Sequence, residues 1–129
     1  MNSNEFEIIV KEKVIVTIID YNRLLNVNNI NKNYYNIFIQ NLFTIINQKM
    51  KEKNERINIL TKKSIRNKLL EYFDIERKKQ HTKYIYLPFN FTNLANFLAV
   101  DRAAMTRELK YMKEEGFIEI KGKRITLLY

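Results

Sequence analysis

The sequence predicts a mainly α-helical chain with one small β hairpin, which is an α+β fold. Three observations predict it: apolar residues from Asn33 onward recur at helical spacing, two capped helices separated by a short turn follow Pro88, and the last residues form two apolar stretches around a glycine. With 129 residues, the chain holds one ordinary domain, or a small domain with an attached helix. We divide it into residues 1–32, with strands and a connection, residues 33–61, a long helix, and residues 62–129, a compact domain.

The charge is unevenly distributed along the chain. The net charge is +9, and residues 61–129 carry fifteen basic against eight acidic residues, whereas residues 1–60 carry eight against six. Such an excess indicates an acidic partner, although charge alone says nothing about the fold. There is no cysteine, which excludes disulfides, thiolate metal sites and a cysteine nucleophile. The single histidine, His81, lies in a polar stretch and is assigned no role.

Neither a membrane span nor a secretion signal is expected. No apolar run approaches the roughly 20 residues that a bilayer requires. The start, Met1 to Glu7, is polar and acidic rather than basic and apolar, so we expect a cytoplasmic protein. The sequence offers no nucleophile with a base and no metal-ligand spacing, so we predict neither an enzyme nor a cofactor.

The N-terminal part predicts strands. Phe6 to Asp20 is rich in Ile and Val, and Val14 to Ile19 suits a strand, but two or three short strands cannot form a stable domain alone. Arg23 to Lys32 is an Asn-rich connection.

The long helix carries an apolar seam. Its members are spaced by alternating steps of four and three if Lys53 is counted as an interrupted position. They are Ile39, Phe43, Ile46, Met50, Ile57 and Leu60. Such a seam packs either on the chain's own domain or on the same helix of a second chain. We favour dimerisation, because the rest of the chain offers little sheet for so long a helix to cover.

A second helix and a short strand follow. The helix is predicted over Lys62 to Lys79, and its last turn holds Arg77 to Lys79, where positive charge complements the helix dipole. Its apolar contacts are expected from Ile65, Leu69, Leu70, Phe73 and Ile75. Tyr84 to Leu87 reads as a strand that Pro88 ends.

Two helices joined by a tight turn come next. Asn90 caps a short helix, Phe91 to Leu98, and Ala99-Val100 form the turn. Asp101 caps a longer helix, Arg102 to Glu115. Gly116 ends this helix, and Leu94, Ala95, Leu98, Met105, Leu109 and Met112 face the core. The spacing predicts a helix-turn-helix unit.

The exposed side of the longer helix predicts contact with DNA. A major groove admits one helix, Arg reads guanine, and small or methyl-bearing side chains suit thymine. The predicted hairpin, Phe117 to Leu128, has a basic tip that would form a wing on the phosphates. The predicted DNA-binding residues are Asn90, Thr92, Arg102, Ala103, Thr106, Arg107, Lys110, Lys121, Lys123 and Arg124. The competing interpretation is a solvated helix face with charge pairs such as Lys110 with Glu114.

Four segments resemble the Crp/Fnr family of bacterial transcription regulators: Lys62 to Leu70, Leu94-Ala95, Val100 to Leu109, and Met112 to Ile118. The resemblance covers roughly residues 34–129. It implies a dimer formed through the long helix, with each recognition helix in a major groove of a palindromic DNA site.

The resemblance also places individual residues. The base-reading positions of the family correspond to Arg102, Ala103 and Arg107, and the position of Ala103 is acidic or serine in the family. Ala99 stands where the family commonly has glycine, a difference of order 1 kcal/mol if the backbone there is left-handed.

The family begins with a cyclic-nucleotide-type β-barrel, of which only the last strands, Glu7 to Ile19, are expected here. We therefore predict no small-molecule effector.

The leading hypothesis is a dimeric, sequence-specific regulator whose occupancy recruits or blocks RNA polymerase. A second hypothesis is an interaction module, a truncated relative that pairs with a full-length regulator and modulates it. A third is a plasmid replication or partition protein, since these also use winged helices.

Overall fold

The computed structural model describes residues 13–20, 22–23 and 32–129. The chain consists of two compact units, Met1–Asn41 and Leu42–Tyr129.

Residues 13–20 form no strand. They lie in neither helix nor strand, and Val14, Ile15, Val16, Ile18 and Ile19 are all more than half exposed. The strand predicted at Val14 to Ile19 is therefore wrong for this structure. An isolated strand leaves its backbone N–H and C=O groups without ladder partners, and alternating side chains without a second layer gain nothing from burial. The rest of the predicted strands and of the connection, residues 6–12 and 24–31, lie outside the described residues.

The long helix is confirmed as α2, Lys32–Leu60. Its predicted seam is largely uncovered, since Phe43, Ile46, Met50 and Ile57 are between 44% and 62% exposed. Leu60 and, in the N-terminal unit, Ile39 are half-buried. The residue that joins α2 to the core is instead Ile59, with 2% of its surface exposed. By helical spacing, Ile59 lies on the side of α2 away from the seam.

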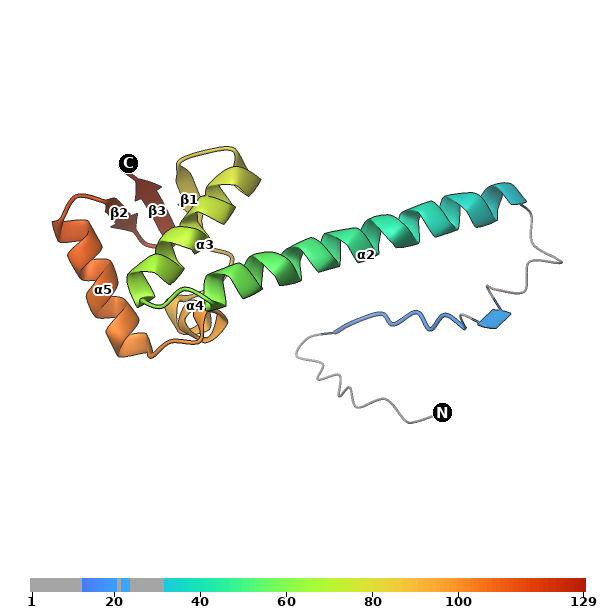
Figure 1. Cartoon of the computed structure of the whole chain (residues 1–129), viewed down its shortest axis with the longest axis horizontal. Helices are drawn as coiled ribbons and strands as arrows, with labels where there is room; N and C mark the ends of the chain where they lie inside the picture. The colour runs from blue at the N-terminus through green and yellow to red at the C-terminus, as the bar shows by residue number, and fades with distance from the viewer. Residues whose placement is uncertain (1–12, 21, 24–31) are drawn as a thin grey trace. The chain divides into compact units, whose positions relative to one another are not determined.

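Helix α3, Ile65–Gln80, begins later than predicted. Ser64 is its N-cap, and the hydroxyl of Ser64 accepts a hydrogen bond of 3.1 Å from the backbone N–H of Asn67. A capped N-terminus explains why Lys62 and Lys63 stay outside the helix. Leu69, Tyr72 and Phe73 are buried, whereas Ile65, Leu70 and Ile75 are only partly covered. The helix packs against both α5 and β1 (Figure 1).

The helix-turn-helix prediction is confirmed by α4, Phe91–Leu98, and α5, Arg102–Glu114. Between them, the backbone turns at Ala99, whose φ of 50° is left-handed. The N–H of Ala99 donates to the carbonyl of Asn96 at 3.2 Å, and the N–H of Val100 donates to that of Ala95 at 3.0 Å. Ala95 is 1% exposed in the core, and its small side chain leaves room for neighbouring elements to approach α4 closely.

Three short strands complete the domain: β1, Tyr84–Tyr86, β2, Ile118–Lys121, and β3, Arg124–Leu127. The predicted hairpin is confirmed by β2 and β3, which turn at Gly122 with φ of 62°. Strand β1 adds to the other edge of β3, so the antiparallel order is β1-β3-β2. The sequence predicted β1 but not its pairing with β3.

One core joins these elements. Its largest fully buried side chains come from every helix and strand of the domain, and they include Phe73, Ile85, Leu94, Met105 and Ile125. The six inward-facing residues predicted for the helix-turn-helix unit are all at most 4% exposed. Among the described residues, no helix is both long and apolar enough to cross a membrane.

We predict that Ala99→Gly raises the free energy of unfolding by about 1 kcal/mol, because glycine adopts the left-handed conformation without steric strain. Urea unfolding of both proteins measures this. Ala103→Gly is the matched control: it places glycine inside the exposed side of α5 and is expected to lower stability by about 0.5–1 kcal/mol. A loss of stability in Ala99→Gly equal to that in the control would contradict the prediction.

Candidate nucleic-acid interface

Helix α5 has one buried and one exposed side. Met105, Leu109 and Met112 are between 0% and 4% exposed and pack into the core. The remaining side presents a continuous set of exposed residues: Arg102, Ala103, Thr106, Arg107 and Lys110. The structure therefore brings together all five residues that were predicted on this helix. A helix that exposes such a face has the dimensions of a reader of the major groove.

A side-chain cap fixes where each helix of the helix-turn-helix unit begins. The carboxylate of Asp101 accepts a hydrogen bond of 2.7 Å from the N–H of Ala104 and starts α5. The amide oxygen of Asn90 accepts one of 2.9 Å from the N–H of Asn93 and starts α4. Asn90 and Thr92 are both exposed at this N-terminus. A free helix N-terminus favours phosphate, but the capping bond occupies the oxygen of Asn90 and leaves its NH2 group for a ligand.

Arg102 and Arg107 are exposed cations at opposite edges of this surface. Neither forms an ion pair within the part of the chain that the structure describes, so neither is held by a neighbouring acid. Lys110 approaches Glu114 at 3.7 Å, but both side chains are more than half exposed, so the pair is weak. The charge-pair interpretation of this face therefore applies to Lys110 and not to the two arginines.

Thr106 presents a restricted chemistry. Its hydroxyl donates to the backbone carbonyl of Arg102 at 2.8 Å. The hydroxyl hydrogen is therefore used within the helix, and what remains for a ligand is the methyl group and an acceptor lone pair. Together with Ala103, Thr106 forms a small, partly apolar patch between the two arginines, which suits a thymine methyl group.

The wing places two of its three cations outward. Lys121 and Lys123 are exposed on either side of Gly122. The backbone N–H of Leu87 donates to the carbonyl of Lys123 at 3.0 Å, which ties the turn to the end of β1. Arg124 differs from the prediction in its surroundings: it is half-buried, and its guanidinium lies 6.0 Å from the ring centre of Tyr84.

An ionic clamp holds α5 against α3. The guanidinium of Arg66 donates to Glu115 through two bonds of 2.7 and 2.8 Å and also to Glu108. It lies 6.0 Å from the ring centre of Phe117 as well. This contact was not predicted from the sequence, since the two acidic partners lie 42 and 49 residues away along the chain. The only signal was the Arg66 position within the segment that resembles the Crp/Fnr family.

A second polar contact supports the turn. The ammonium of Lys68 donates to the carbonyl of Leu98, the last residue of α4, at 3.1 Å. Carbonyls at a helix C-terminus lack partners within the helix, and a cation there is favourable. Lys68 therefore links α3 to the turn that sets the angle between α4 and α5.

The hydrogen bonds from Arg66 lower the pKa of Glu115, and they raise the pKa of Arg66 itself. Both residues remain charged at neutral pH. Among the described residues, no group of three or more His, Cys, Asp or Glu side chains is placed to hold a metal ion.

Two capped helices joined by a tight turn, a basic exposed helix face and a hairpin that follows it define a winged helix-turn-helix DNA-binding domain. Residues 65–129, half of the chain, match the Crp-like helix-turn-helix domain. The chain belongs to this family, and the resemblance to Crp/Fnr regulators is confirmed. Its function at this level is that of a DNA-binding regulator. No curated protein matches the chain.

We predict that the Arg66 clamp makes stability depend on pH. The lowered pKa of Glu115 means that its contribution is present above its ordinary value of 4.5 and is lost as the pH falls through the folded-state pKa. Arg66→Gln should therefore lower the unfolding midpoint clearly at pH 7 and much less at about pH 3.

Arg77→Gln is the matched control for this measurement, because Arg77 pairs at 3.1 Å with Asp74 on its own helix and does not bridge to α5. Thermal unfolding followed by circular dichroism at both pH values compares the three proteins. An Arg66→Gln effect of equal size at both pH values would show that the clamp acts through packing rather than charge.

Proposed function

We propose that this chain is a sequence-specific transcription regulator that acts as a dimer on a palindromic DNA site. The observation that carries the proposal is the exposed side of α5, where Arg102 and Arg107 have no ion-pair partner in the described chain and flank the small patch of Ala103 and Thr106. Arg reads guanine through a bidentate pair of hydrogen bonds, so an arginine that is free to move onto a base edge confers sequence preference.

The wing and the start of α4 are assigned to the phosphates. Lys121 and Lys123 are exposed at the hairpin tip, and Thr92 is exposed in the first turn of α4. Contacts of this kind set the position and affinity of the protein on the duplex but carry little sequence information. They also make the affinity depend on salt.

The seam of α2 is assigned to dimerisation. In the C-terminal unit, Phe43, Ile46, Met50 and Ile57 share one side of α2 and are 44–62% exposed. Exposing such an apolar stripe to water is unfavourable, and pairing with the same stripe of a second copy would remove the apolar surface from water. A dimer would hold two α5 helices for half-sites about one helical turn apart, near 10 base pairs. Bound in the cytoplasm next to a promoter, it would recruit or block RNA polymerase.

The first test is selection of bound duplexes from a random pool by the purified full chain at near-physiological salt. A regulator of this kind should enrich a palindrome with half-sites about 10 base pairs apart. Recovery of no common sequence would contradict the proposal and favour the interaction module that pairs with a full-length regulator.

We predict that Arg102→Ala and Arg107→Ala each weaken binding to the selected site by about 5- to 150-fold, which corresponds to about 1–3 kcal/mol for a lost base contact, and relax preference at one base pair. Fluorescence anisotropy with the selected duplex and single-base variants measures both effects. Arg77→Ala, which removes an arginine from the last turn of α3, is the control and should leave affinity and preference unchanged. Uniform weakening on all sequences would assign the α5 arginines to phosphates instead.

We predict that Phe43→Asp with Ile46→Asp converts the protein to a monomer, because two carboxylates cannot be buried in an apolar seam. Sedimentation equilibrium measures the mass. Gln48→Asp with Asn58→Asp adds the same two charges to exposed positions off the seam and should leave the dimer intact. A dimer that survives both pairs of substitutions would place the dimer contact elsewhere.

A further inference from the structure

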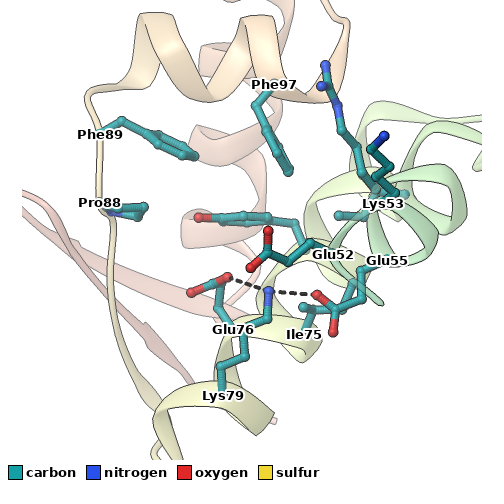
Figure 2. A pocket seen from close by; sticks show the side chains of 12 residues that line it. Glu52, Lys53, Glu55, Ile75, Glu76, Lys79, Pro88, Phe89 and Phe97 are labelled. Carbon is teal, nitrogen blue, oxygen red and sulfur yellow. Dashed lines mark ion pairs between the residues drawn. The ribbon is translucent and has the colours of Figure 1, made fainter. Parts of the chain in front are cut away.

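A hollow of about 520 Å³ opens between α2, α3 and the segment that leads into α4, and none of its lining residues belongs to α5. All of its lining residues belong to the C-terminal unit. Its volume lies within the range of small-molecule sites in proteins, about 300–1,000 Å³. Figure 2 shows the side chains of Phe89 and Phe97 pointing into the hollow from one side and the acids of α2 and α3 facing it from the other.

Three aromatic rings form the apolar part of the hollow. The ring centres of Tyr72, Phe89 and Phe97 are 5.8–6.3 Å from one another. Tyr72 is tilted by 31° from Phe89 and by 63° from Phe97. Such spacing is that of interacting aromatic pairs, and a further flat ring in the hollow would meet both faces and edges. Ile59 closes this part from the side of α2.

One polar group in the hollow lacks a partner. Tyr72 is 3% exposed, and its hydroxyl makes no hydrogen bond to any described residue. Burial raises the pKa of Tyr72, so the phenol stays protonated and can donate. A buried hydroxyl without a partner destabilises a protein by about 1–3 kcal/mol, and an acceptor on a bound molecule would relieve that cost.

The charges at the rim are unequally satisfied. Lys79 lies 2.6 Å from Glu55 and 3.7 Å from Glu76, as the dashed lines in Figure 2 mark. Glu52 pairs with Lys49 at 2.9 Å. Each acid of the lining thus already has a cation.

Two rim cations, in contrast, have no carboxylate partner within the described ranges of the chain: Lys53 and Arg56. The guanidinium of Arg56 lies 5.1 Å from the ring centre of Phe97, which places a fixed positive charge directly above the aromatic part. The positive charges of this rim therefore favour a bound anion, whereas a bound cation would have to displace Lys79 from Glu55 and Glu76.

We propose that this hollow is a binding site for a planar aromatic carboxylate, whose ring lies among Tyr72, Phe89 and Phe97 and whose anionic group meets Arg56 and Lys53. An acceptor atom on the ring completes the hydrogen bond of Tyr72. The site goes beyond the proposed function, since it requires no DNA, and it departs from the expectation that no small molecule is bound. That expectation concerned the N-terminal strands, and the hollow lies elsewhere.

The position of the site gives the ligand a means of regulation. Phe97 belongs to α4, Tyr72 to α3 and Arg56 to α2, so one molecule would touch three helices at once. Binding at a junction of this kind stabilises the arrangement it fits. The ligand is therefore expected to couple the α2 helix to the helix-turn-helix unit.

The test is titration of the full chain with quinoline-3-carboxylate, whose ring nitrogen is a hydrogen-bond acceptor, without DNA, by calorimetry and by amide chemical shifts. We expect saturable one-to-one binding with a Kd below about 1 mM, with the shifts concentrated around Tyr72, Phe89 and Phe97. Absence of saturation at that concentration would overturn the proposal, since ordinary water would then be the partner of the Tyr72 hydroxyl. Tighter binding of the cationic analogue 3-(aminomethyl)quinoline would overturn the assigned charge.

Two variants and one control separate the contacts. Arg56→Gln should raise the Kd about 10-fold and Tyr72→Phe about 5-fold, the range for a charged and a neutral hydrogen bond. Tyr72→Phe should raise the stability of the free protein, because the deleted hydroxyl is buried and has no partner among the described residues. Lys51→Gln removes a cation of α2 that does not line this hollow and should not change the Kd.

An equal rise in the Kd for Lys51→Gln would show that the effect comes from the net charge of the protein, and this would overturn the proposed site. The monomeric variant Phe43→Asp with Ile46→Asp should bind like the native chain. Binding seen only in that variant would show that a second copy covers the hollow, and this too would overturn the proposal.

Discussion

The burial of one side of α5 is the constraint on which the rest of the domain depends. Met105, Leu109 and Met112 recur at helical spacing and are all at most 4% exposed. Since residues three and four apart share a side of a helix, burying these three turns Ala103, Arg107 and Lys110 outward together. Arg102 is exposed because it stands at the first position of the helix. The hydrophobic effect on the inner side thus selects which polar residues are presented on the outer side. The caps at Asp101 and Asn90 then fix where the exposed surface begins.

The distribution of acids complements this arrangement. Arg66 engages Glu108 and Glu115, the acids of α5 and its end that lie nearest to α3. These carboxylates are thereby drawn to the inner edge of α5 and away from the arginines of its outer side. A basic surface arises here because acids are bound elsewhere, not only because bases are abundant.

Helix α2 has different tasks on its two sides. Its exposed seam offers an apolar stripe, while Ile59, on the other side, is 2% exposed in the core of the winged domain. The hollow beside Ile59 lies at the junction of α2 with α3 and α4. If the exposed side pairs with a second copy, as proposed, while the other side packs near the helix-turn-helix unit, α2 can transmit a change from one side to the other, because packed side chains shift between discrete arrangements rather than continuously.

The sequence by itself determined the local structure of this protein. Helical spacing predicted α2 and α5 to within a residue at each end, capping residues located α4 and α5, and a tight turn was expected at Ala99-Val100. These features depend on contacts within one or two helical turns, so neighbouring residues carry the whole signal. Only the tertiary structure decided the partners of Arg66, the pairing of β1 with β3, the aromatic hollow around Tyr72 and the failure of residues 13–20 to form a strand. Each of these depends on which distant segments meet, and that choice is made by the packing of the whole core, which no local pattern encodes.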